Sequence, residues 1–180
     1  MYLNMIIPVV QSQCSGTVTL NDVSGVITDG YDTYPAGTDC EWLIQPKDSE
    51  GNLINDPITV TFTSVDMGST SSGYFDFVYV FDSASVSWAH GLGAASGSGL
   101  TIPPQSYTST GGSMYIYFRS WGSSIGGSGF RLEYTTTNQC QGVTCANGKK
   151  CFNSVDDYSC ICPNGNMAAN ANCAEVNHCF

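Results

Sequence analysis

The sequence has few charged residues and very few basic ones. Charged side chains make up 11% of its 180 residues, and 5 Lys and Arg stand against 15 Asp and Glu, for a net charge of −10. Basic residues never cluster beyond Lys149-Lys150. A nucleic-acid surface needs clustered cations, so this composition argues against one. An acidic surface can attract basic partners or cations, but solubility is the simpler explanation of the charge.

Long apolar runs and helical periodicity are also missing. No stretch of about 18 apolar residues is present, so we predict no transmembrane helix. Gly, Ser and Thr are abundant, which favours an all-β scaffold of short strands and many turns over a helical protein.

Catalytic constellations are equally scarce. His90 and His178 are the only histidines, so neither a zinc hydrolase site nor a catalytic triad can be assembled. The pattern Gly-x-Ser-x-Gly occurs at Gly122–Gly126. It lies between two predicted strands rather than between a strand and a helix, so we interpret it as a chance match. We therefore predict that the chain is not an enzyme.

The nine cysteines and the N-terminus indicate an extracellular protein. Cysteines in recognisable spacings are typical of an oxidising compartment. Residues 1–10 are apolar, and Val10-Gln11-Ser12 resembles a signal-peptide cleavage site. We interpret residues 1–12 as a truncated signal peptide and predict secretion, with an ordinary first strand as the alternative.

Alternation of apolar and polar residues predicts the strands of a β-sandwich. Ile58, Val60 and Phe62 would face one side of a strand that continues to Val65. The residues from 75 to 81 are mostly apolar, as expected of a strand covered on both sides. Other segments of the same kind are Ser113–Arg119 and Phe130–Tyr134. The Ser- and Gly-rich segments 67–73, 83–99 and 121–129 are predicted to be flexible, exposed loops.

Several motifs, in order, resemble those of a CUB domain. They are Ser24-Gly25-Val26-Ile27-Thr28, Tyr34-Pro35, Cys40-Glu41-Trp42-Leu43-Ile44, Tyr74-Phe75-Asp76-Phe77-Val78-Tyr79-Val80, and Met114 to Ser120 leading into Gly129-Phe130 and Tyr134. The resemblance covers residues 13–135. It implies a CUB-like jelly-roll β-sandwich with Cys14 bridged to Cys40. The second disulfide of the family is missing, since Gly73 and Ser96 occupy those places, which predicts a more mobile region between residues 67 and 99.

The resemblance also defines candidate binding residues in this domain. Many CUB domains hold calcium with three carboxylates, whose positions correspond to Gly68, Asp76 and Trp121 here. Only Asp76 keeps a carboxylate, and a calcium ion takes six or more oxygens with two or three charges. Asp76 is therefore a weak metal candidate, with a structural hydrogen-bond acceptor as the stronger alternative. The loop aromatics Trp121, Trp88 and Tyr74 are candidate contact anchors for a partner.

Six cysteines in the C-terminal segment indicate a small, crosslinked module. The segment is too short for a stable apolar core, so crosslinks must contribute. Paired Cys-x-x-Cys units are absent, which makes zinc the weaker alternative. Spacing alone leaves fifteen connectivities open. The six are Cys140, Cys145, Cys151, Cys160, Cys162 and Cys173.

The spacing of these six cysteines resembles that of an EGF-like module, which would span residues 138–173. Tyr158 and Cys162-Pro163-Asn164-Gly165 match that family in addition to the cysteines. The resemblance implies the pairs Cys140–Cys151, Cys145–Cys160 and Cys162–Cys173.

The stretch from Cys151 to Cys160 resembles the calcium-binding subfamily. By that resemblance Gln139 and Asn153 would offer side-chain oxygens, and Thr137 and Ser154 carbonyl oxygens. Thr136 stands where the subfamily has Asp, so calcium binding would be weak. Residues 174–180 resemble the start of a further EGF-like module, with a free or intermolecular thiol at Cys179 as the alternative.

Together these patterns predict a secreted, non-enzymatic binding or adhesion fragment of a longer multi-module chain. Its partner would be an extracellular protein or a glycan, with calcium as a candidate cofactor. The alternative is the non-catalytic CUB–EGF assembly region of an extracellular protease.

Overall fold

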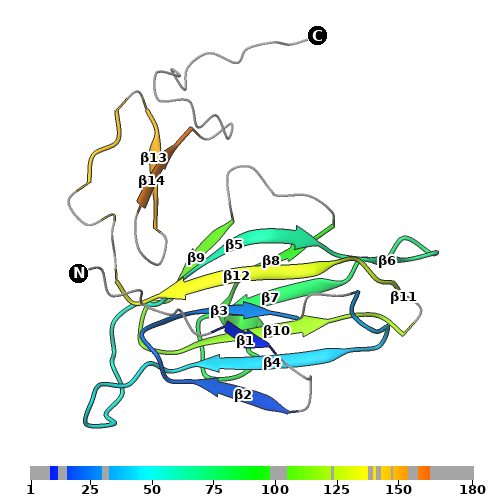
Figure 1. Cartoon of the computed structure of the whole chain (residues 1–180), viewed down its shortest axis with the longest axis horizontal. Helices are drawn as coiled ribbons and strands as arrows, with labels where there is room; N and C mark the ends of the chain where they lie inside the picture. Colours follow the sequence, from blue (N-terminus) through cyan, green and yellow to red (C-terminus); the bar gives the residue numbers. More distant parts are fainter. Residues whose placement is uncertain are drawn as a thin grey trace, which may run out of the picture.

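The chain forms a two-layer β-sandwich followed by a small hairpin (Figure 1). The computed structural model describes residues 9–11, 16–29, 33–97, 105–122, 124–137, 140, 143–146, 148–153 and 158–162. In the first five-stranded sheet the order is β1 (Val9–Gln11), β3 (Ser24–Thr28), β12 (Gly129–Thr135), β5 (Thr59–Asp66) and β9 (Ser106–Thr108). In the second it is β2 (Thr17–Leu20), β4 (Asp39–Ile44), β10 (Met114–Arg119), β7 (Phe77–Phe81) and β8 (Gly91–Ser96).

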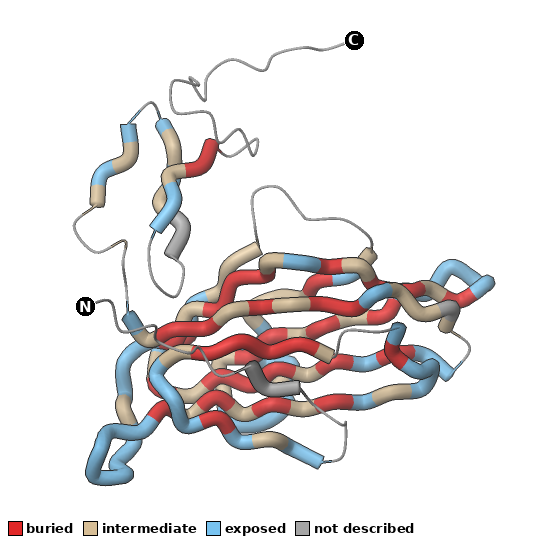
Figure 2. The backbone as a smooth tube through the Cα atoms, viewed as in Figure 1, coloured by how far each residue is buried: buried red, intermediate tan, exposed pale blue. Residues whose placement is uncertain are grey.

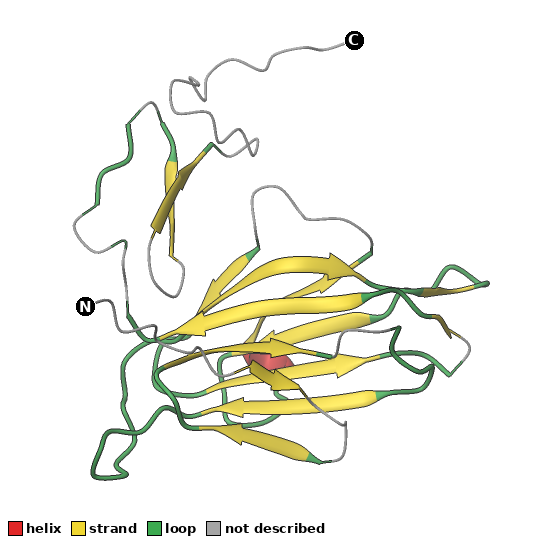
Figure 3. Cartoon of the chain, viewed as in Figure 1, coloured by secondary structure: helices red, strands yellow, loops and turns green. Residues whose placement is uncertain are grey.

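The predicted all-β sandwich is confirmed. Figure 3 shows strands and loops, and among the described residues the one helical turn is the 3-10 helix η1 (Trp88–His90). No helix in the described part of the chain is long and apolar enough to cross a membrane.

Side-chain alternation places the core between the two sheets. Strand β10 pairs antiparallel with β4 on one side and β7 on the other. Its Met114, Ile116 and Phe118 are fully buried, as the alternation predicted. Burying each such side chain stabilises the fold by about 1.5–3 kcal/mol. Figure 2 shows the resulting rows of buried residues along the strands.

Aromatic rings lock the two sheets together. Phe130 of β12 lies edge-on to Trp42 of β4, with centroids 5.8 Å apart, and contacts Phe118 of β10 at 5.6 Å. The ring of Phe62 from β5 lies 6.3 Å from that of Phe130. Phe130 therefore joins both layers at the centre of the core.

A register shift in β5 follows from its sequence. Ile58, Val60 and Phe62 are buried, but the next buried apolar residue is Val65, three positions on rather than two. The pairing with β12 shifts between Arg131 and Leu132. Such a bulge adds one residue to a strand and restores the inward direction of Val65.

Two sequence expectations were wrong in this sandwich. Residues 83–99 were predicted to form a flexible loop, but Gly91–Ser96 is strand β8, paired antiparallel with β7. Small residues give that strand low β-propensity. They are used for close packing, since a Cβ at Gly93 would overlap the ring of Tyr107. The predicted loops 67–73 and 121–129 likewise contain the short paired strands β6 (Ser69–Thr70) and β11 (Ser124–Ile125).

The second error concerns β7. The strand begins at Phe77, and Val78 and Val80 point into the core while Phe77 and Tyr79 are only half-buried. No second layer of the sandwich covers its outward face at Phe77 and Tyr79, although Phe81 on the same face is buried and contacts Trp88. The apolar run at residues 75–81 arises instead from aromatic side chains on that outward face.

The N-terminal segment is partly described. Residues 9–11 form β1, which pairs parallel with β3, Val10 opposite Ile27. The remainder of segment 1–12 lies outside the described residues, so its interpretation as a signal peptide stays a prediction.

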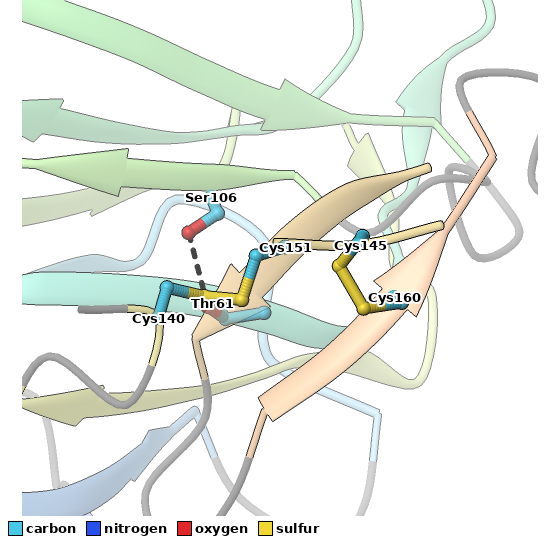
Figure 4. The surroundings of a disulfide bond; sticks show 6 residues. All are labelled: Thr61, Ser106, Cys140, Cys145, Cys151 and Cys160. Atoms are coloured by element: carbon cyan, nitrogen blue, oxygen red, sulfur yellow. Dashed lines mark hydrogen bonds between the residues drawn. A yellow bond between two sulfur atoms is a disulfide. The ribbon is translucent and has the colours of Figure 1, made fainter. Parts of the chain in front are cut away.

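The C-terminal segment contains a disulfide-linked hairpin. Strands β13 (Lys150–Asn153) and β14 (Tyr158–Ile161) pair antiparallel, with Cys151 opposite Cys160. Disulfides join Cys140 to Cys151 and Cys145 to Cys160 (Figure 4). These are the first-to-third and second-to-fourth links that the sequence resemblance implied.

Two further cysteine pairings stay predictions. Cys40 and Cys162 are disulfide-bonded. Cys14 and Cys173, the partners that the resemblance assigns to them, lie outside the described residues. So do residues 174–180.

Candidate binding surface

One carboxylate, Asp76, organises the loops at one end of the sandwich. It is fully buried, just before β7. Its Oδ2 accepts hydrogen bonds from the hydroxyl of Tyr34 at 2.7 Å and from that of Ser124. Its Oδ1 accepts from the backbone N–H of Trp121 at 2.9 Å. Three segments distant in sequence therefore meet at this side chain.

The backbone of Gly68 completes the cluster. The N–H of Asp76 donates to the carbonyl of Gly68 at 3.0 Å, and the N–H of Gly68 donates to the hydroxyl oxygen of Tyr34. Burial is the main cause that raises the pKa of Tyr34 well above its ordinary value, and the hydrogen bond to Asp76 is the second. The phenol therefore stays protonated and remains a donor.

Asp66, a carboxylate close to Gly68 in the sequence, hydrogen-bonds to Ser128. Its Oδ2 accepts hydrogen bonds from the backbone N–H of Ser128 at 3.0 Å and from the Ser128 hydroxyl. These bonds hold the pKa of Asp66 below its ordinary value. Within the described residues, no group of three or more His, Cys, Asp and Glu side chains could hold a metal ion.

Trp121 is fixed by this cluster and still exposed. Its backbone is held by Asp76, and its indole N–H donates to the carbonyl of Phe75 at 2.9 Å. The side chain of Arg119 lies over the indole, 5.2 Å from the ring centroid. The ring of Tyr74, 63% exposed, is 5.8 Å away. Because Trp121 itself remains 41% exposed, it is a rigid ring available for contact.

Trp88 belongs to a second group of rings, on the outward face of the second sheet. Trp88 is 68% exposed and lies edge-on to Tyr79 at 5.1 Å and to Phe81 at 5.3 Å. Tyr79 in turn stacks on Phe77 at 5.4 Å and on Tyr117 at 6.2 Å. Phe77, Tyr79 and Phe81 of β7 and Tyr117 of β10 alternate with core residues of their strands, so they point outward, and Trp88 of η1 packs against this face.

Arg119 connects the two groups. It lies opposite Phe77 in the register of β10 with β7, strands that run side by side in Figure 1, and it covers Trp121. The three aromatics chosen from sequence, Tyr74, Trp121 and Trp88, thus lie on one continuous surface. We call this surface the aromatic strip and define it as Tyr74, Trp121, Arg119, Phe77, Tyr79, Tyr117 and Trp88.

Sequence reasoning missed the centre of the strip. The alternation that placed Ile116 and Phe118 inside also placed Tyr117 outside, and Phe77 and Tyr79 follow by the same rule. The signal was present, but it showed only that these rings face away from the core. That they are neighbours depends on the pairing of β7 with β10.

Carboxylates border the strip along β4. The hydroxyl of Tyr117 donates to Asp39 at 3.1 Å, and that of Tyr115 donates to Glu41 at 2.8 Å. Arg119 lies 3.9 Å from Asp39, an exposed pair of small energetic value. Burial raises the pKa of both tyrosines above the ordinary value, so both remain neutral donors.

The CUB domain family model matches residues 14–134, which span both sheets and the Asp76 cluster. The chain belongs to the CUB domain family. A CUB domain is a non-catalytic module, which agrees with the absence of a catalytic constellation in the sequence.

Several known proteins are similar to this CUB chain. Protein tag-53 of Caenorhabditis elegans is 29% identical over 157 residues, 87% of this chain and 10% of the relative. Human tolloid-like protein 1 is 31% identical over 105 residues, 58% of this chain and 9% of the relative. The chain therefore spans about a tenth of the length of these curated relatives.

Solved structures show the same fold. The CUB1-EGF-CUB2 domains of rat MASP-1 superpose with a TM-score of 0.53 at 22% identity, covering 82% of this chain and 54% of that one. The corresponding human MASP-1/3 domains give 0.50 at 23% identity, with 78% and 51% covered.

The C-terminal calcium candidates lie largely outside the described part. Thr137 is described, and its N–H donates to the hydroxyl of Thr135 at 3.0 Å. Gln139 and Ser154 lie outside the described residues, as does the side chain of Asn153. Calcium binding there stays a prediction.

Proposed function

We propose that this chain is a secreted, non-enzymatic recognition fragment whose CUB domain binds an extracellular protein through the aromatic strip. The observation that carries this proposal is the continuity of the strip. Trp88, Trp121 and Tyr74 come from three separate loops, yet ring contacts and Arg119 join them on one face. Trp, Tyr and Arg are the residues that dominate binding energy at protein interfaces.

Rigid anchors make this surface suited to binding. Ordering a mobile side chain on binding costs about 0.5–1.5 kcal/mol. Trp121 avoids much of that cost, because hydrogen bonds to Asp76 and Phe75 hold its backbone and ring before any partner arrives. The exposed rings of Tyr74, Trp88 and Trp121 then supply contact area in the form that interfaces favour.

Cell-surface binding tests the proposal. Fluorescently labelled chain is titrated onto intact cells and onto cells treated with trypsin, and bound label is measured by flow cytometry. We expect saturable binding that trypsin abolishes. Trp88→Ala and Trp121→Ala should each weaken it by about tenfold or more, which corresponds to loss of a hot-spot residue.

Leu53→Ala is the matched control, because Leu53 is 57% exposed and lies outside the strip. It should leave the affinity unchanged. Equal binding by the wild-type chain and both tryptophan variants would overturn the proposal. Binding that survives trypsin but is lost after glycosidase treatment would replace the protein partner by a glycan.

We further propose that residues 138–173 form an EGF-like module that spaces the CUB domain from the next module. The hairpin and the bonds Cys140–Cys151 and Cys145–Cys160 support it. Calcium would bind weakly through Gln139 and Asn153, with carbonyls of Thr137 and Ser154. Calorimetry on the full chain should show heat at millimolar calcium, which Asn153→Ala abolishes; its absence from the wild-type chain would refute the site.

A second candidate function is the non-catalytic part of an extracellular protease. The similarity to human tolloid-like protein 1 and to the CUB1-EGF-CUB2 domains of MASP-1 favours it. The complete transcript distinguishes the candidates. A protease domain encoded beyond these residues would support this alternative, and further EGF-like modules without one would support the adhesion fragment.

A further inference from the structure

The Asp76 cluster occupies the position where the family resemblance implies a calcium ion. The three corresponding positions are Gly68, Asp76 and Trp121, and the structure does bring them together. Asp76 donates its N–H to the Gly68 carbonyl at 3.0 Å and accepts from the Trp121 N–H at 2.9 Å. Of the three, only Asp76 has a carboxylate. Two of the three carboxylates that the family resemblance implies for a calcium site are therefore missing.

The groups directed at Asp76 already use both of its oxygens as hydrogen-bond acceptors. The hydroxyls of Tyr34 and Ser124 donate to Oδ2, and the Trp121 N–H donates to Oδ1. A calcium ion takes six to eight oxygen ligands. To bind here it would have to displace these donors and leave them unsatisfied around a side chain that is fully buried. The residues present do not fit calcium.

We propose that a hydrogen-bond lock, formed by Asp76, Tyr34, Ser124 and the Trp121 N–H, replaces the calcium ion in this CUB domain and fixes its loop end without metal. The lock does the structural work of a cation, because donors with partial positive charge hold the segments of Tyr34 and of Trp121 and Ser124 against the segment that carries the carboxylate. Because the lock needs no metal-binding carboxylate at position 121, that position can carry the outward-facing ring of Trp121. Asp76 is thus a positioning residue for that ring.

Hydrogen exchange of the full chain tests the lock. Amide exchange of peptides covering residues 66–76 and 119–125 is measured by mass spectrometry in EDTA and in millimolar calcium. We expect the rates in both segments to agree within about twofold in the two solutions. Slowing by about tenfold in calcium would overturn the proposal. Peptides from residues 138–173 report separately, so calcium bound there does not affect the outcome.

A tyrosine variant tests which donors form the lock. Tyr34→Phe removes the hydroxyl but keeps the ring that packs edge-on against Phe118 at 5.0 Å. Exchange at Gly68 and Trp121 should quicken by about tenfold, equally in EDTA and calcium, because both amides depend on this cluster.

The control is Tyr107→Phe, which removes the hydroxyl of a half-buried tyrosine, bonded to the Ala94 carbonyl at 3.4 Å. It should leave exchange at Gly68 and Trp121 unchanged. Restoration of protection by calcium in Tyr34→Phe would contradict the lock, as would unchanged exchange in that variant. No partner is present in these measurements, so their failure leaves the proposed binding function untouched, and failure of the binding test leaves the lock untouched.

Discussion

The carboxylate of Asp76 accepts a hydrogen bond from the backbone N–H of Trp121 at 2.9 Å, across a sequence separation of 45 residues. Loss of this acceptor should be costly. Asp76→Ala leaves the Tyr34 hydroxyl and the Trp121 N–H without their partner in a buried site, and we expect a loss of about 3 kcal/mol or more in the free energy of unfolding. Urea denaturation followed by circular dichroism measures it.

Asp66→Ala is the comparison for that experiment. Asp66 also accepts two hydrogen bonds, both from Ser128, but at the exposed end of β5, where water can replace it. We expect a loss of about 1 kcal/mol or less. Similar losses in the two variants would show that burial of the Asp76 cluster does not matter energetically.

Phe130 should be among the most sensitive core positions. Its ring contacts Trp42, Phe62 and Phe118 from both layers. Phe130→Ala would leave a cavity between the sheets and should cost about 3–5 kcal/mol, measured by chemical denaturation. Leu53→Ala, at an exposed position, should cost less than about 0.5 kcal/mol. A mild effect at Phe130 would mean that the sheets can close the gap.

Substitution of two glycines with the same φ angle distinguishes the cost of backbone strain from the cost of steric overlap. Gly129 and Gly51 both have φ of +87°, but a Cβ at Gly129 would overlap the Asp29 carboxylate, whereas nothing lies within 4 Å of one at Gly51. Gly51→Ala should cost about 1 kcal/mol for strain alone. Gly129→Ala should cost at least about 2 kcal/mol more, because the clash adds to the strain. Thermal unfolding of the two variants provides the comparison, and equal shifts in Tm would contradict it.

The stability of the sandwich should depend on the protonation of Asp29. Burial raises the pKa of Asp29 from 3.8 to about 6, although its Oδ1 accepts a hydrogen bond from the Phe130 N–H at 2.9 Å. Between these two pH values the folded chain holds a proton that the unfolded chain has released. The stabilising contribution of protonated Asp29 to the free energy of unfolding is therefore fully present below pH 3.8. It is lost as the pH rises through about 6.

Asp29→Asn removes this titration and is the test. The stability difference between variant and wild type should shift in favour of the variant, on the order of 1 kcal/mol, on going from acidic to neutral pH. Urea unfolding across that range measures it. A difference that stays constant with pH would show that Asp29 has an ordinary pKa in the folded chain.

Local patterns predicted the core well. The alternation at Met114, Ile116 and Phe118 needs only the period of a strand, and so does the burial of Ile58, Val60 and Phe62. The failures share a physical cause, which is dependence on a distant partner. Strand β8 has poor intrinsic propensity and forms because β7 offers it an edge.

The candidate site was predictable as a set of residues and not as a surface. Trp88, Trp121 and Tyr74 could be chosen as loop aromatics, and Gly68, Asp76 and Trp121 could be aligned as altered metal positions. That the Asp76 carboxylate accepts hydrogen bonds from hydroxyl groups depends on Tyr34 and Ser124, which lie 42 and 48 residues away in sequence. No local pattern connects them.

The sequence by itself determined that this chain is an all-β protein with a crosslinked C-terminal segment, because strand period and cysteine spacing are short-range properties. Its CUB domain was implied by the resemblance of ordered motifs to that family. Only the tertiary structure decided what surrounds Asp76 and which rings share a face. Those relationships are set by how β7 and β10 pair and by which loops meet at the end of the sandwich. Such long-range contacts depend on the packing of the whole domain rather than on any one segment.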